Sequence, residues 1–169
     1  DQWDHILTSP LLRCREFAAE LAREKNLPFT VAHDFKEISF GDWEGKTREQ
    51  VAQEYGDHQA NFWRDAESHP PSNAETVQDF HQRIGEAWIQ WQQTLKGQRV
   101  LLVCHGGVIR MVLAHVLSMA PSNMAQAPLA RSRCWSQHAA SERSWVASTR
   151  VQPLCRCHRN NSSATALAV

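Results

Sequence analysis

The strongest candidate for chemistry in this sequence is His105. It follows the apolar run Val100–Cys104 and precedes Gly106 and Gly107, after which a helix is predicted. An imidazole at the end of a buried strand lies where α/β proteins bind ligands. Glycines at that point let backbone N–H groups approach an anion at the start of the helix. Taken alone, His105 is equally compatible with a ligand-binding and a structural role.

Two further segments place ionisable side chains where they could act with His105. Arg13 lies in the first turn of a predicted helix, just after the strand candidate His5–Thr8, so its guanidinium can point toward the same sheet edge. Glu37 opens the glycine-bounded loop Glu37–Gly45, which also carries an aromatic residue and suits a general acid with a tuned pKa. Separately, such an arginine is usually a surface residue and such a loop is usually a turn.

Short strands and helices alternate along the chain and must position these residues. Apolar residues at three-to-four spacing predict the helices, and short β-prone runs predict the strands. The predicted order is strand His5–Thr8, a helix to about Lys25, strand Phe29–Ala32, a helix from Thr47, a helix from Glu75 to about Leu95, strand Arg99–Cys104 and a helix from Val108 to about Met119. The apolar strand Arg99–Cys104 is typical of a central parallel strand covered on both faces. The sequence therefore predicts a three-layer α/β/α fold with a mostly parallel sheet.

Capping residues mark the starts of two helices. Ser9 can cap the first helix, with Pro10 in its first turn. Thr47 and Gln50 fit a capping box, in which each side chain binds the other residue's backbone N–H.

Composition excludes several classes of partner. Lys plus Arg equal Asp plus Glu at 18 each, so no broad cationic field is available for nucleic acid or an anionic membrane. The longest apolar stretch is interrupted by polar residues and is too polar to span a membrane. The chain starts with acidic residues rather than a signal-peptide pattern, so we expect a cytoplasmic protein with reduced thiols among its five cysteines.

The pattern of apolar and polar residues changes near Gln126. We predict one domain over residues 1–126 and a weakly ordered or non-native tail over 127–169, where neither helical nor strand periodicity is sustained. Cys134, Cys155, Cys157 and His158 offer zinc-type ligands in this tail. Their spacing does not give two well-separated ligand pairs, so an unstructured tail is the preferred interpretation and no metal site is expected.

Taken together and in this order, the motifs resemble the histidine phosphatase (phosphoglycerate mutase-like) superfamily. The resemblance rests on Ser-Pro-Leu-x-Arg-Cys from Ser9, Glu-x-x-Phe-Gly-x-Trp-Glu-Gly from Glu37 and His-Gly-Gly from His105. Pro71–Thr76 is similar to the family's Pro-x-Gly-Glu-Ser helix start, with Ala74 in place of glycine. Among family members, the short loops look most like small bacterial phosphatases of the α-ribazole phosphatase type, which serve cobalamin synthesis.

The resemblance implies a phosphomonoesterase that works through a phosphohistidine and needs no cofactor. Arg13 would clamp phosphoryl oxygens, with Ser9 and Gly106 completing the substrate-binding set. Glu37 would be the proton donor, with Glu44 as the second candidate, and His105 would stabilise charge on the transferring group. The partner implied is a small phosphorylated metabolite, and a homodimer is kept open.

One element of the family pattern is missing from these 169 residues. The family's nucleophile lies in an Arg-His-Gly motif on a strand expected upstream of Trp3, and no such triplet occurs here. We therefore expect the domain to be incomplete at the N-terminus and this chain to be inactive, since loss of a nucleophile costs several orders of magnitude in rate. The alternative is a non-catalytic remnant that binds phosphate or a partner.

Overall fold

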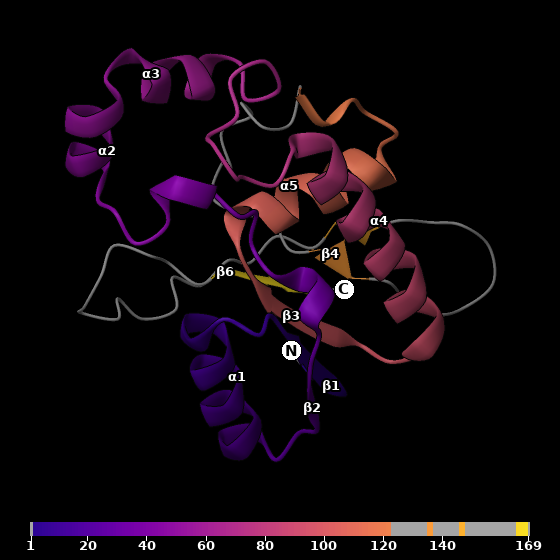
Figure 1. The fold of residues 1–169 in the computed structure, drawn as a ribbon. Coiled ribbons are helices and arrows are strands. Elements are labelled where there is room, and N and C mark those ends of the chain that lie inside the picture. Colours follow the sequence, from indigo (N-terminus) through magenta and orange to yellow (C-terminus); the bar gives the residue numbers. More distant parts are fainter. Residues whose placement is uncertain (1, 123–134, 137–145, 148–164, 169) are drawn as a thin grey trace.

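A four-stranded sheet forms the centre of the molecule (Figure 1). The computed structural model describes residues 2–122, 135–136, 146–147 and 165–168. The sheet has the order β2-β1-β3-β6, with β1 at His5–Thr8, β2 at Phe29–Val31, β3 at Val100–Cys104 and β6 at Thr165–Ala168. Strand β1 pairs in parallel with β2 and β3, whereas β6 pairs antiparallel with β3. The prediction of a mostly parallel sheet is confirmed.

Helices cover both faces of this sheet (Figure 1). The helices are α1 at Leu12–Lys25, α2 at Arg48–Tyr55, α3 at Asp57–Arg64, α4 at Val77–Thr94 and α5 at Gly106–Val116. Two 3-10 turns, η1 at His33–Phe35 and η2 at Gly41–Trp43, lie in the segment between β2 and α2. The short strands β4 at Trp135–Ser136 and β5 at Val146–Ala147 pair with each other outside the main sheet.

The core follows the alternation of side chains along β3. Leu102 and Cys104 belong to the hydrophobic cluster that packs under α4 and α5. Leu101 and Val103 belong to the cluster that packs under α1 on the opposite face. Because successive strand residues point to opposite faces, an all-apolar strand needs helices on both sides. The predicted three-layer arrangement is confirmed.

The two predicted caps have different outcomes. The capping box at Thr47 is confirmed, because Thr47 Oγ1 accepts the Gln50 N–H at 3.2 Å and Gln50 Oε1 accepts the Thr47 N–H at 2.8 Å. The prediction that Ser9 caps the first helix is wrong, since the N-cap is Leu11. Ser9 is buried, its Oγ lies 2.6 Å from Nε2 of His105, and the same Oγ accepts the N–H of Leu11 at 3.3 Å just before the helix.

Two boundaries also differ from the predictions. Helix α5 begins at Gly106, two residues earlier than expected, because the glycines lie inside its first turn and His105 is its N-cap. In the tail, Thr165–Ala168 forms a strand although the sequence showed no strand periodicity. Its pairing with β3 depends on backbone hydrogen bonds that any sequence can make. Apart from the three short strands β4, β5 and β6, residues 123–169 lie outside the described residues, including the zinc-type residues Cys134, Cys155, Cys157 and His158.

A small aromatic cluster stands apart from the sheet, where α2 and α3 pack against η2 (Figure 1). Its buried members are Trp43, Val51 and Phe62, with Phe40 partly buried against them. Within the described residues, no helix is long and apolar enough to cross a membrane.

Candidate active site

His105 lies at the carboxyl end of β3 and is only 2% exposed. Its Nε2 atom is 2.6 Å from Oγ of Ser9, which follows directly after β1, the neighbouring parallel strand. The Sγ atom of Cys14 lies 3.7 Å from both ring nitrogens, so the thiol packs beside the ring. The ends of β1 and β3 therefore meet at the sheet edge that was expected to carry the site.

The surroundings of His105 keep its ring neutral. Burial is the main cause and the positive charge of Arg13 the second, and together they lower the pKa of His105 to about 3. A neutral imidazole can exchange one hydrogen bond with Ser9 and offer another to a ligand. A bound phosphate would add negative charge nearby and so favour the protonated ring.

Arg13 brings a positive charge to the same edge of the sheet. It lies in the first turn of α1, next to the end of β1, and its side chain is exposed. Its charge acts on His105 and also on Glu37 and the thiol of Cys14. The structure thus places Arg13, Glu37 and His105 within electrostatic range of one another, as the sequence motifs required.

Glu37 reaches the N-terminus of α5 from the loop after η1. Its Oε2 accepts the backbone N–H of Gly107 at 3.1 Å, and its Oε1 accepts the N–H of Ile38 at 3.1 Å. A Cβ atom at position 107 would lie 2.2 Å from Oε1 of Glu37, so the carboxyl group would have to move away. Glycine at position 107 is therefore required for the carboxyl group to approach the helix end.

Burial raises the pKa of the Glu37 carboxyl above its usual range. The hydrogen bonds from Gly107 and Ile38 act in the opposite direction, as do the charges of Arg13 and Arg110, but they are the smaller effects. A raised pKa increases the protonated fraction near neutral pH, which a proton donor needs. The sequence motif identified this carboxyl, and its environment suits the role.

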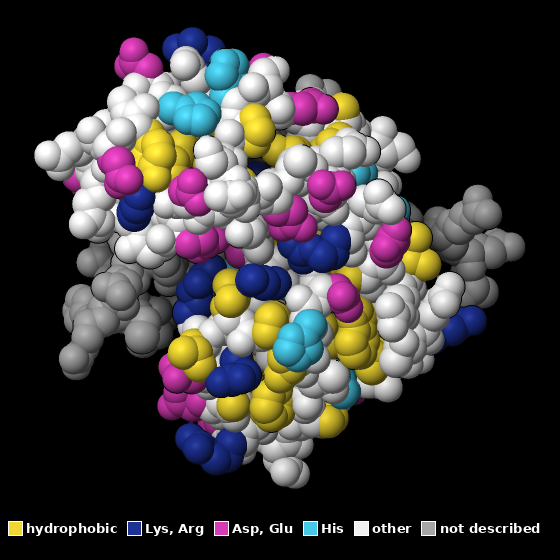
Figure 2. Space-filling view, in the orientation of Figure 1, with side chains coloured by type: hydrophobic (Ala, Val, Ile, Leu, Met, Phe, Trp, Pro, Cys, Tyr) yellow, Lys and Arg dark blue, Asp and Glu magenta, His cyan; other side chains and the backbone are white. Residues whose placement is uncertain are grey.

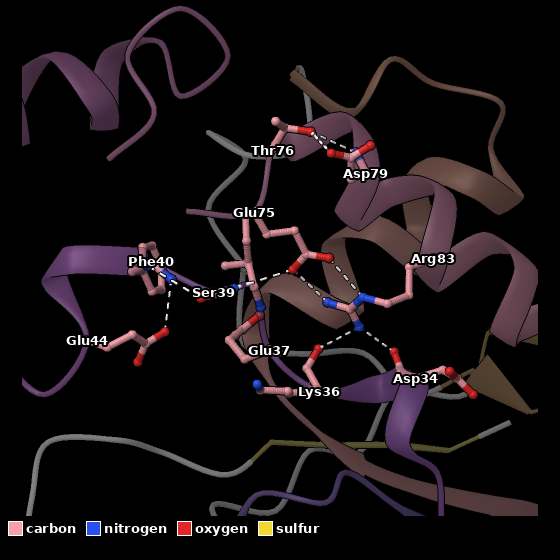
Figure 3. A network of polar contacts seen from close by, with 12 residues as sticks. Asp34, Lys36, Glu37, Ser39, Phe40, Glu44, Glu75, Thr76, Asp79 and Arg83 are labelled. Atoms are coloured by element: carbon pink, nitrogen blue, oxygen red, sulfur yellow. Dashed lines mark hydrogen bonds and ion pairs between the residues drawn. The ribbon is translucent and has the colours of Figure 1, made fainter. Parts of the chain in front are cut away.

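Glu44, the second candidate acid, has a different position. It is exposed, and its Oε1 accepts the backbone N–H of Phe40 at 2.9 Å across the η2 turn. The carboxyl group of Glu44 thus closes its own loop (Figure 3). The carboxyl group of Glu37 instead accepts a hydrogen bond from Gly107 of α5. Glu37 is the better placed of the two acids.

An ion pair between Glu75 and Arg83 holds the loop that carries Glu37 (Figure 3). Arg83 Nε and Nη2 donate to the two carboxylate oxygens of Glu75 at 2.9 and 2.8 Å. Arg83 Nη1 donates to the carbonyls of Asp34 at 2.5 Å and Lys36 at 3.1 Å, just before Glu37 in the chain. The backbone on the N-terminal side of Glu37 is therefore fixed to α4.

The other side of Glu37 is held by Ser39. The N–H of Glu75 donates to the carbonyl of Ser39 at 3.0 Å, and the N–H of Ser39 donates to the Glu75 carboxylate at 3.4 Å. Sequence reasoning placed Glu75 in a helix-start motif and gave Arg83 no role. The available signal was their spacing of eight residues around the start of one helix, which allows the two side chains to meet.

The two motif loops also meet at Gly41. Asp42 donates its N–H to the carbonyl of Ser72 at 3.0 Å, and Asn73 Nδ2 donates to Asp42 Oδ1 at 2.9 Å. Gly41 has φ +55°, and a Cβ atom there would lie 2.1 Å from the Ser72 carbonyl oxygen. Glycine is needed at this contact, so the loop motif and the Pro71–Thr76 motif form one structural unit.

On the face shown in Figure 2, Lys and Arg side chains lie interspersed with Asp and Glu side chains. No group of three or more His, Cys, Asp or Glu side chains in the described part of the chain could hold a metal ion. The arrangement that remains is an arginine and a helix N-terminus suited to an anion, a neutral histidine, and a carboxyl group with a raised pKa.

Comparison with known proteins identifies a family and several relatives that match this chain. The model of the histidine phosphatase superfamily (branch 1) matches residues 1–151. An adenosylcobalamin/alpha-ribazole phosphatase of Escherichia coli K12 is 27% identical over 134 residues, which are 79% of this chain and 66% of that protein. A 2,3-bisphosphoglycerate-dependent phosphoglycerate mutase of Bartonella quintana is 26% identical over 117 residues, 66% of this chain and 57% of that protein.

Solved structures of other proteins have a fold similar to that of this chain. Bacillus stearothermophilus YhfR superposes with a TM-score of 0.68 at 28% identity, covering 75% of this chain and 63% of that one. The chain spans 66% of the length of the E. coli relative and 57% of the mutase. The match extends over most of the chain and includes the three motifs that suggested the resemblance, so this chain belongs to the histidine phosphatase superfamily.

Proposed function

We propose that this chain supplies the phosphate-binding and proton-donating part of a phosphomonoester hydrolase that works through a phosphohistidine. The observation that carries the proposal is the partly buried carboxyl group of Glu37, with its raised pKa, at the N-terminus of α5 beside His105 and Arg13. A helix end and an arginine bind a phosphoryl group, and a neutral acid next to them can protonate the leaving oxygen.

The reaction would proceed in two steps. A histidine nitrogen attacks phosphorus, the ester P–O bond breaks, and Glu37 gives its proton to the leaving alcohol. Water then attacks the phosphohistidine, the P–N bond breaks, and the Glu37 carboxylate takes the proton from water. Arg13 and His105 would stabilise the charge on the transferring group in both steps. Ser9 would act through His105, because its hydroxyl is bonded to that ring.

The substrate we propose is a small phosphorylated metabolite, with α-ribazole 5′-phosphate as the first candidate. The name of the E. coli relative and the short loops around the site support this candidate. A homodimer, also kept open by the sequence, would be tested by light scattering.

The nucleophile is the point on which turnover depends. The sequence of 169 residues contains no Arg-His-Gly triplet. His105 is buried and its ring is hydrogen-bonded to Ser9. We therefore propose that this chain by itself binds phosphate without hydrolysing esters at an appreciable rate. The second candidate function, a non-catalytic phosphate or partner binder, rests on the same observation.

Binding and turnover measured on the same chain test the proposed site. Isothermal titration with inorganic phosphate should show binding that is lost in Arg13→Ala and in His105→Ala. Arg15→Ala is the matched control, because Arg15 is also exposed and lies two residues further along α1. It should bind phosphate as the unmodified chain does.

The release of nitrophenol from p-nitrophenyl phosphate reports turnover in the same samples. No release with intact phosphate binding supports the proposal for this chain and favours the binder. Hydrolysis that stays at full rate in Arg13→Ala and His105→Ala would refute the site assignment. Absence of phosphate binding would refute both functions.

A further inference from the structure

A cavity of about 210 Å³ opens next to the carboxyl group of Glu37. One side is formed by the site itself, through Glu37 and the glycines at the start of α5. The opposite side is formed by α3 and the residues after it. Because the cavity is continuous with the proposed proton donor, whatever part of a substrate extends beyond the scissile oxygen would enter it.

Aromatic rings form the wall of the cavity opposite the proton donor. Phe62 lies with its ring 5.0 Å from that of Trp63 and 5.9 Å from that of Phe40, both in edge-to-face geometry. The three rings support one another, so the wall is preformed. Trp63 is nonetheless 51% exposed, although the guanidinium of Arg48 lies 5.7 Å from its ring centroid. A tryptophan face of this kind is suited to contact with a flat apolar group.

Two acidic side chains, Asp65 and Glu67, also line this cavity. Hydrogen bonds from Ser68 lower the pKa of Asp65, which therefore carries a negative charge near neutral pH. Arg110 is the basic residue among the lining side chains, and it already interacts with other groups of the chain. A substrate carboxylate in the cavity would face like charge, which disfavours it.

We propose that this cavity is the leaving-group subsite and that it selects phosphomonoesters whose leaving alcohol carries an uncharged aromatic ring over carboxylated ones such as phosphoglycerates. The inference rests on the proposed function for the position of the phosphate and adds the chemistry of the rest of the substrate. Trp63 is the specificity-determining residue, because it offers the exposed ring. Asp65 and Glu67 exclude carboxylates.

The size of the cavity fits such a group. A cavity of about 150 Å³ lined by apolar side chains is large enough to bind benzene. The 210 Å³ next to Glu37 can therefore hold a single ring or a small fused ring system. Most of the side chains that line it are apolar, so an aromatic group would lose little hydrogen bonding on entering.

Titration calorimetry on the whole 169-residue chain tests the subsite without requiring turnover. The probes are inorganic phosphate, 1-naphthyl phosphate, glycerol 2-phosphate, 3-phosphoglycerate and 1-naphthol. We expect 1-naphthyl phosphate to bind about tenfold more tightly than glycerol 2-phosphate, the size of effect a stacked aromatic pair supplies. We expect 3-phosphoglycerate to bind no more tightly than glycerol 2-phosphate.

Trp63→Ala should remove most of the preference for the naphthyl compounds and leave inorganic phosphate within about twofold. Phe29→Ala is the matched control, because Phe29 is an exposed aromatic residue on β2 that does not line the cavity. Phe29→Ala should change neither the preference for the naphthyl compounds nor the affinity for inorganic phosphate. The double variant Asp65→Asn, Glu67→Gln should increase the affinity for 3-phosphoglycerate severalfold without changing that for 1-naphthyl phosphate.

The outcomes separate the subsite from the proposed function. The subsite proposal is wrong if 1-naphthyl phosphate and glycerol 2-phosphate bind equally well, or if the preference for the naphthyl compound survives in Trp63→Ala. In either case, binding of inorganic phosphate would still support the proposed function. Conversely, Trp63-dependent binding of 1-naphthol with no binding of inorganic phosphate would keep the aromatic subsite and overturn the proposed function.

Discussion

The Oγ atom of Ser9 lies 2.6 Å from Nε2 of His105, and both side chains are buried. The same Oγ accepts the N–H of Leu11 at 3.3 Å, at the start of α1. Ser9 therefore connects the ends of two neighbouring strands with the helix that carries Arg13. This contact fixes the orientation of the histidine ring and joins the parts of the site that lie on different elements.

Ser9→Ala should destabilise the fold and weaken phosphate binding. The variant removes the hydroxyl partner of the buried Nε2 of His105 and leaves only the Cys14 thiol at 3.7 Å, which costs about 1–3 kcal/mol of unfolding free energy. Chemical denaturation and phosphate titration measure the two effects. Thr30→Ala is the matched control, because Thr30 Oγ1 makes a similar contact of 3.0 Å with Nε2 of His5 away from the site. An equal loss of phosphate binding in Thr30→Ala would contradict the prediction.

The lowered pKa of His105 predicts a loss of stability in acid. The folded ring has a pKa of about 3 against 6.5 for an unperturbed histidine. Between these values the unfolded chain binds more protons, so the free energy of unfolding should fall as the pH falls from about 6.5 toward 3. Above 6.5 this contribution is constant.

His105→Gln removes this titration and should flatten the pH dependence of the unfolding free energy, measured by denaturant melts from pH 4 to 8. His33→Gln, at the exposed start of η1, is the control and should leave the dependence as it is. The same slope in His105→Gln as in the unmodified chain would show that another group is responsible.

Arg83→Ala should loosen the loop that carries Glu37. The substitution removes the donors to the carbonyls of Asp34 and Lys36 and leaves the Glu75 carboxylate without its ion-pair partner. We expect the free energy of unfolding to fall by about 1–3 kcal/mol. We also expect faster hydrogen exchange of the Ile38 N–H, which donates to the Glu37 carboxyl group.

Arg99→Ala tests whether that effect is specific to the loop. Arg99 also makes two hydrogen bonds to one carboxylate, that of Asp4, but the pair is exposed and distant from Glu37 in the fold. Water screens such an exposed pair, so its loss should change stability little. The Ile38 amide should exchange normally in Arg99→Ala, and acceleration there as well would argue against a local effect of Arg83.

Gly107→Ala should disrupt the contact between Glu37 and α5. The new Cβ would lie 2.2 Å from Oε1 of Glu37, so the carboxyl group must move away from the Gly107 N–H. Because the carboxyl group lies at the end of a flexible side chain and can move, we expect a cost of about 0.5–1.5 kcal/mol, that of the lost hydrogen bond. In a double-mutant cycle with Glu37→Ala, the cost of Gly107→Ala should largely disappear, because the clashing atoms are gone. Additive costs would show that the strain arises elsewhere.

The sequence by itself determined the local elements and the identity of the site motifs. Apolar spacing predicted α4 with Phe80 and Ile84 inward, and both are buried in it. The chain order of strand, helix and glycine turn predicted a mostly parallel sheet with Arg13 and His105 at one edge. These features follow from side-chain period and local backbone preference, which depend only on neighbouring residues.

Only the tertiary structure decided how the site is held together. Ser9 and His105 are 96 residues apart, and Glu37 and Gly107 are 70 apart. Such contacts depend on how the strands and helices pack, so local pattern assigned Ser9 to a helix cap and left Arg83 without a role. The strand at Thr165–Ala168 was missed for the same reason, because backbone pairing with β3 leaves no signature in side-chain spacing. The packing likewise set the pKa directions of Glu37 and His105, since burial is the main cause of both.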